Sequence, residues 1–206
     1  HSLQSVVIGN GHPVPDANFE KESPPVVLWL ASLKQVKNPD IFIKLFESAK
    51  DLPCQFWVVG RPVDEKIHEQ IRRTAAEHNN FEYLGGCDII ESNEYFKKAS
   101  VYVHTGNAEG FPNTFIQAWL HQTPVVSFYA DPDAALANND IGAHCDSLDE
   151  AASVLGQLIT DSEYRTAVGN NAREYGITHH SIGTIVDKIE RQLGNLIVEP
   201  PEREGS

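Results

Sequence analysis

The sequence predicts an α/β fold of Rossmann type, in which helices cover both faces of a parallel sheet and further helices form a C-terminal cover. Two observations carry this prediction. From residue 25 to about residue 147, short apolar runs alternate with segments of helical periodicity, as consecutive βαβ units require. After about residue 147 only helical periodicities follow. With 206 residues, of which 41% are hydrophobic, the chain can bury one sizeable core.

Five runs rich in β-branched and aromatic residues predict the strands, and each is bounded by turn residues. They are 26–30, 55–59, 81–84, 101–104 and 125–128. The first intervening helix follows Asn38-Pro39, a pair that suits a helix start. Apolar residues recur at helical spacing along it and along the next two helices (Phe42, Leu45, Phe46 and Ala49; Ile67, Ile71 and Ala75; Tyr95, Phe96 and Ala99).

Three apolar stripes predict the helices of the cover. They are formed by Ala152, Leu155 and Ile159, by Tyr164, Val168 and Tyr175, and by Ile182, Ile185, Ile189 and Leu193. Residues 1–24, which are rich in proline, are predicted to be an interdomain linker segment, residues 25–198 the domain, and residues 199–206 a flexible tail. Because the chain begins at His1 and contains no Met, we interpret it as part of a longer protein.

Charge and cysteine content restrict the function. Sixteen Lys and Arg against 29 Asp and Glu leave a formal charge of −13, which argues against a sequence-independent nucleic-acid binder. A phosphate-bearing ligand would therefore need a local basic cluster. Cys54, Cys87 and Cys145 form no CxxC pair and are predicted to be reduced thiols. No apolar run approaches a membrane span, no signal peptide is recognisable, and no basic amphipathic face predicts membrane contact.

Ligands of open parallel sheets bind beyond the carboxyl ends of the strands, so the loops there are the candidate sites. In the loop after the first strand, Lys34 and Lys37 precede a helix and suit a diphosphate, although two solvated surface lysines would show the same pattern. After the second strand, Gly60 would let a ligand approach the backbone and Arg61 could contact a phosphate. Residues 85–88 form either a base-binding loop or a plain turn.

The loop after the fourth strand carries the clearest signal. Pro112 suits a first helical turn and leaves the amides of Asn113 and Thr114 available to an anion. The Glu109 carboxylate beside such a site suits sugar hydroxyls. Along the following helix one line of residues is predicted to face the core (Phe111, Phe115 and Trp119) and another is polar (Asn113, Gln117 and His121).

Residues 109–115, E-G-F-P-N-T-F, resemble a motif of the retaining, metal-independent glycosyltransferases of group 1 (family 4), which have the GT-B fold. Residues 33–37 resemble the basic strand-end loop of that family, residues 56–60 its second strand, and residues 168–175 with His180 its late helices. The similarity runs in order over about residues 5–195. It implies the C-terminal, donor-nucleotide-binding half of such an enzyme, without the N-terminal half that binds the acceptor.

The resemblance also implies residue roles. Glu109 would contact the donor sugar near its reacting carbon, and Lys37 would hold the departing diphosphate as its charge develops. The donor would further be bound by Lys34 and Arg61 and by the backbone of Gly110, Phe111, Pro112, Asn113 and Thr114. Two positions depart from the family pattern: Gln117 stands where a glutamate usually contacts the ribose, and Ser32 where an arginine is frequent. Both departures predict weaker donor binding.

The function expected from this resemblance is transfer of a sugar from a nucleoside diphosphate, UDP rather than GDP, to a saccharide or glycoconjugate acceptor in polysaccharide biosynthesis. The acceptor would be held by the missing N-terminal domain, so the chain alone is expected to be inactive. We expect a cytoplasmic location, with the inner membrane surface as an alternative for the full-length enzyme. No metal or other cofactor and no nucleic-acid partner are expected, although Asp131-Pro132-Asp133 spells a D-x-D metal signature as well as a turn. A non-catalytic sugar-nucleotide-binding module and a nucleotide-sugar epimerase are the alternative functions.

Overall fold

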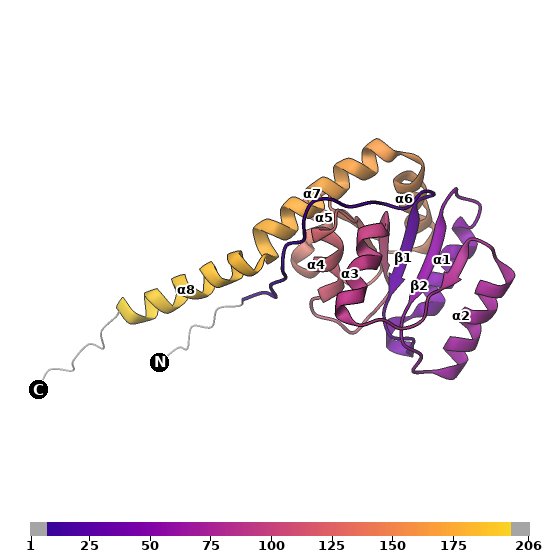
Figure 1. Ribbon diagram of the computed structural model, residues 1–206, viewed down its shortest axis with the longest axis horizontal. Coiled ribbons are helices and arrows are strands. Elements are labelled where there is room, and N and C mark those ends of the chain that lie inside the picture. The colour runs from indigo at the N-terminus through magenta and orange to yellow at the C-terminus, as the bar shows by residue number, and fades with distance from the viewer. Residues whose placement is uncertain (1–7, 199–206) are drawn as a thin grey trace, which may run out of the picture.

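The computed structural model describes the backbone of residues 8–198 and the side chains of residues 8–194 (Figure 1). Its centre is a parallel sheet of six strands in the order β3-β2-β1-β4-β5-β6. The strands are β1 (Val26–Leu30), β2 (Gln55–Val59), β3 (Phe81–Tyr83), β4 (Val101–His104), β5 (Val125–Ser127) and β6 (Gly142–His144). The predicted α/β fold of Rossmann type is therefore confirmed, with five strands close to their predicted bounds and a sixth that was not predicted.

The strand order reverses between β1 and β4. β1 pairs on one side with β2, Val27 opposite Phe56, and on the other side with β4, Val27 opposite Val101. The loops that leave the carboxyl ends of β1 and β4 therefore diverge toward opposite faces of the sheet. A crevice opens at such a switch point in doubly wound folds.

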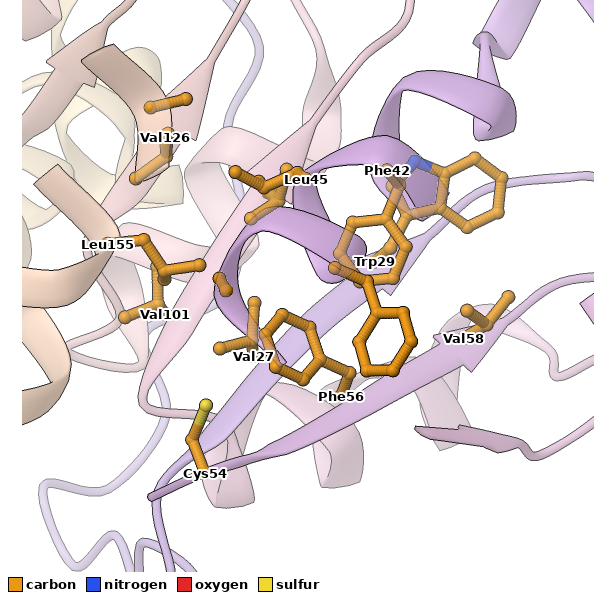
Figure 2. Packing of buried hydrophobic residues seen from close by; sticks show 14 of the residues in the cluster. Val27, Trp29, Phe42, Leu45, Cys54, Phe56, Val58, Val101, Val126 and Leu155 are labelled. Carbon is orange, nitrogen blue, oxygen red and sulfur yellow. The ribbon is translucent and has the colours of Figure 1, made fainter. Parts of the chain in front are cut away.

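Helices cover both faces of the sheet. They are α1 (Pro39–Ala49), α2 (Glu65–Glu77), α3 (Ile89–Lys98), α4 (Asn113–Leu120), α5 (Ala135–Asn139), α6 (Leu148–Thr160), α7 (Ser162–His180) and α8 (Ile182–Val198), with short 3-10 helices at Gln35–Lys37 and Pro132–Ala134. On one face α1, α2 and α6 bury an aromatic core, in which Phe42 and Phe46 pack on Phe56 with ring centroids 6.1 and 5.1 Å apart (Figure 2). On the other face α3, α4, α5 and α7 enclose the second core.

The C-terminal helices form the predicted cover. α7 lies against α4 at Gly176, where a Cβ atom would be 3.2 Å from Leu120 Cδ2. α8 continues beyond the sheet, as Figure 1 shows, and exposes a row of apolar side chains (Ile182, Val186, Ile189 and Leu193). Within residues 8–198, no helix has the length and apolar character needed to cross a membrane.

Residues 8–24 run along the helices as an extended segment, here called the N-terminal strap. The backbone N–H of His12 donates to the carbonyl of His180 at 2.8 Å, and the Arg173 guanidinium donates to the carbonyl of Pro15 at 2.7 Å. The buried ammonium of Lys21 donates to three carbonyl oxygens and one hydroxyl (Phe96, Ala99, His121 and Thr123). Residues 8–24 of the predicted linker thus pack on the domain, whereas residues 1–7 and the predicted tail 199–206 lie outside the described residues.

Candidate functional site

A cavity of about 560 Å³ lies at the carboxyl ends of β1 and β4, at the switch point of the sheet. It is lined by the two loops that carry the strongest sequence signals and by the start of α4. The lining residues are Trp29, Leu30, Ala31, Ser32, Lys34, Lys37, Tyr102, His104, Thr105, Gly106, Glu109, Gly110, Phe111, Asn113 and Thr114. The structure therefore brings together seven of the predicted site residues, Lys34, Lys37, Glu109, Gly110, Phe111, Asn113 and Thr114.

An ion pair between Lys37 and Glu109 joins the two loops across the cavity. The side chains are about one-fifth exposed, 20% for Lys37 and 24% for Glu109. Burial, and then the neighbouring charge of Lys34, lower the pKa of the Lys37 ammonium from its usual value. Directly after Lys37 the chain turns into α1 through Asn38, whose φ of 47° lies in the left-handed region that asparagine tolerates.

Neutral hydrogen bonds hold the two loops in register. The Thr105 hydroxyl donates to the carbonyl of Lys37 at 2.6 Å and accepts from the Trp29 indole N–H at 2.8 Å. The Asn38 amide donates to the carbonyl of Thr105 at 2.9 Å. Because these bonds fix the backbone on either side, Lys37 and Glu109 meet without depending on each other for their placement.

The N-terminus of α4 adds an anion-binding element to the cavity. Pro112 is the N-cap and no side chain caps this end, so the amides of Asn113 and Thr114 precede the first intrahelical bond, which Phe115 donates to the carbonyl of Pro112 at 3.0 Å. Such free amides and the positive end of the helix dipole attract anions. The buried Tyr102 hydroxyl donates to Thr114 Oγ1 at 3.0 Å and fixes this turn.

His104, which the sequence analysis did not select, lies behind the ion pair. It is only 4% exposed, and its Nε2 atom is 3.5 Å from Oε2 of Glu109. Burial, and then the Lys37 charge, lower the pKa of His104 to about 4, so the ring is neutral at pH 7. The signal available in the sequence was a histidine at the carboxyl end of an apolar strand, five positions before Glu109.

Two predicted site residues lie outside the cavity. Gln117 faces α3, where its amide donates to Ser92 Oγ at 2.8 Å and Asn93 Oδ1 at 3.1 Å, and it lines a separate cavity of about 200 Å³. Arg61 is exposed beyond the end of β2, and its stem lies against Gly86. The physical reason is position: Gln117 is on the side of α4 that packs on α3, and Arg61 leaves a strand that is one place removed from the switch point.

The acidic residues of the D-x-D motif are partly used by the fold. The Asp131 carboxylate accepts hydrogen bonds from the backbone N–H groups of Leu136 and Ala137 at 2.7 and 3.2 Å, and so caps α5. In the part of the chain that the structure describes, no three His, Cys, Asp or Glu side chains group closely enough to hold a metal ion.

A cavity with two lysines and a helix N-terminus at the switch point of a Rossmann-type sheet is typical of proteins that bind nucleotides. A family model of the glycosyl transferases group 1 matches residues 14–175. The chain belongs to this family, as residues 109–115 indicated.

Solved structures share the fold at low sequence identity. TarM from S. aureus, in complex with fondaparinux, alpha-GlcNAc-glycerol and UDP, matches 93% of this chain and 40% of its own at 21% identity, with a TM-score of 0.78. The pneumococcal O-GlcNAc transferase GtfA, in complex with UDP and GlcNAc, matches 97% of this chain and 41% of its own at 18% identity (TM-score 0.74). HepE from Anabaena, in complex with UDP and glucose, matches 92% and 56% at 23% identity (TM-score 0.71). The chain thus spans between 40% and 56% of these proteins. A comparison with curated proteins gave no match.

Proposed function

We propose that the chain is the donor-nucleotide-binding half of a retaining glycosyltransferase that uses a nucleoside-diphosphate sugar, with UDP as the favoured nucleotide. The observation that carries the proposal is the convergence of Lys37, Glu109 and the free N-terminus of α4 on one cavity. A diphosphate matches the lysines and the helix amides, and a sugar hydroxyl matches the carboxylate.

In this proposal the residues divide the donor between them. The amides of Asn113 and Thr114 and the ammonium of Lys37 bind the diphosphate and stabilise the charge that develops on it as the glycosidic bond breaks. Glu109 holds the donor sugar near its reacting carbon. Because fixed cations and helix amides supply the positive charge, the reaction requires no metal ion.

The preference for UDP is supported by the solved structures, since TarM, GtfA and HepE are all described in complex with UDP. The acceptor, a saccharide or glycoconjugate, would be held by an N-terminal half that this chain does not include, and we propose that the chain alone does not transfer sugar. The three cysteines are free thiols, which supports a cytoplasmic location.

The proposal is tested by isothermal titration of the chain with UDP, GDP and ADP, with and without magnesium. UDP should bind with the same affinity in both conditions. Lys37→Met should weaken UDP binding about tenfold or more, because a charge-assisted contact to the diphosphate is lost. The control is Lys50→Met, which removes an exposed lysine at the far end of α1 and should leave the affinity unchanged. Absence of binding by all three nucleotides would refute the proposal.

A donor-binding module that performs no transfer is a second candidate, and the position of Gln117 favours it. The amide of Gln117 is engaged by α3 and does not reach the cavity where the family's glutamate would serve the ribose. The decisive assay joins the chain to an acceptor-binding half and follows sugar transfer from the donor. Transfer would exclude the module, whereas donor binding without transfer would establish it.

A further inference from the structure

The His104 ring is packed on its faces but has no polar partner. Phe115 meets it edge-on with ring centroids 5.1 Å apart, and Tyr102 lies at 6.4 Å. Neither ring nitrogen has a hydrogen-bond partner among residues 8–194, and both are shielded from solvent. A buried polar atom without a partner is unfavourable by about 1–3 kcal/mol, so such an atom calls for an explanation.

The partner that His104 lacks stands next to it. Nε2 is 3.5 Å from Oε2 of Glu109, slightly beyond hydrogen-bond distance, while Oε1 of the same carboxylate is paired with Lys37. Gly106 keeps this space open, because a Cβ atom there would lie 3.1 Å from Nε2. In the ligand-free chain Lys37 thus holds Glu109, and His104 is poised behind it.

A bound diphosphate changes this balance, because it competes with Glu109 for the Lys37 ammonium. We propose that His104 is then the positioning residue of Glu109: its Nε2–H donates to Oε2 and holds the carboxylate against the donor sugar when Lys37 turns to the diphosphate. This inference rests on the proposed function. His104 does not touch the ligand itself, since its nitrogens are shielded, and it acts through Glu109 alone.

The coupling is measurable without any ligand, by following the pKa of His104 in NMR spectra of the chain. Lys37→Met frees the carboxylate for the histidine and should raise this pKa by about one unit or more. Adding Glu109→Gln to that variant should return the pKa to near its starting value. The control Lys34→Met removes a neighbouring charge that does not pair with Glu109 and should change the pKa less. Equal pKa values in Lys37→Met and in the double variant would overturn the proposal.

Ligand binding then separates a positioning role from packing. His104→Leu keeps the volume and removes the donor, whereas His104→Gln keeps an N–H near the position of Nε2. Affinities are measured for UDP-glucose, UDP-GlcNAc and UDP. His104→Leu should weaken the better nucleotide sugar about tenfold and UDP less than about twofold, and His104→Gln should retain most of the affinity.

The outcomes distinguish this inference from the proposed function. Equal weakening of UDP and of the nucleotide sugar by His104→Leu would show that the histidine only packs, and would overturn the positioning role. If the unaltered chain binds neither UDP nor a nucleotide sugar, the proposed function fails. In that case the NMR coupling of His104 to Glu109 still decides whether the histidine positions the carboxylate.

Discussion

Gly60, at the end of β2, is the position where one methyl group should do most damage to the candidate site without touching it. A Cβ atom there would lie 1.8 Å from the carbonyl oxygen of Ala31 and 2.9 Å from its carbon. Both atoms belong to the backbone, so no side-chain rotation can relieve the overlap. Gly60→Ala must therefore separate the ends of β1 and β2 and displace the loop that carries Lys34 and Lys37.

The size of the effect follows from the contacts that this separation breaks. Overpacking a tight site costs about 1–3 kcal/mol. Moving Ala31 away also lengthens the hydrogen bond from its N–H to the Val59 carbonyl, now 3.0 Å, which contributes about 1 kcal/mol. We expect Gly60→Ala to lower the free energy of unfolding by about 2–4 kcal/mol, equivalent to about 5–15 °C in Tm for a chain of this length.

Urea unfolding followed by the fluorescence of the three tryptophans measures this change. Gly156→Ala is the matched control, because a Cβ atom on Gly156, inside α6, meets no atom within 4 Å. Alanine there should raise stability by about 0.5–1 kcal/mol, through helix propensity alone. The reasoning is refuted if the two variants change stability by the same amount or with the same sign.

Two further predictions concern acid and the N-terminal strap. Burial lowers the pKa of His104 and His121 to about 4, so the unfolded chain binds these protons more readily; stability is complete above pH 6.5 and is lost as the pH falls toward 4, by about 1 kcal/mol per histidine at pH 5.5. His121→Gln should remove half of this loss in urea midpoints measured at pH 7.5 and 5.5, and a loss equal to that of the unaltered chain would contradict the assignment. Arg173→Met removes the bond to Pro15 and should accelerate tryptic cleavage after Lys21, because the strap detaches more often; Arg72→Met, an exposed change on α2, should not.

Most of the sheet could be predicted because its strands are continuous runs of β-branched and aromatic residues that helices bury on both faces. β6 was not predictable from its own residues, since Gly142, Ala143 and His144 have no strand preference. This strand forms because β5 offers a free edge, with Val126 opposite Ala143. Tertiary pairing, not local sequence, fixes this element.

The candidate site was predictable where the residues follow strand ends, as Lys37 and Glu109 do. Gln117 was not, because its direction depends on how α4 turns against α3, which periodicity alone does not settle. Gly60 was interpreted as an opening for a ligand, whereas the structure shows that the carbonyl of Ala31 occupies the space beside it. His104 was read as a strand residue, since its missing hydrogen-bond partner is visible only in three dimensions.

The pairing of β1 with β4 has a consequence for the order of folding. In the described sheet it is the one pair of neighbouring strands that do not follow each other in the chain. The segment from β1 to β3 can associate early, but Lys37 meets Glu109 only after β4 has closed a long loop onto β1, a step that sequence separation slows. A nucleotide can therefore recognise the chain only when folding is nearly complete. It should slow unfolding while leaving the folding rate unchanged, and protect finished domains rather than rescue unfinished ones.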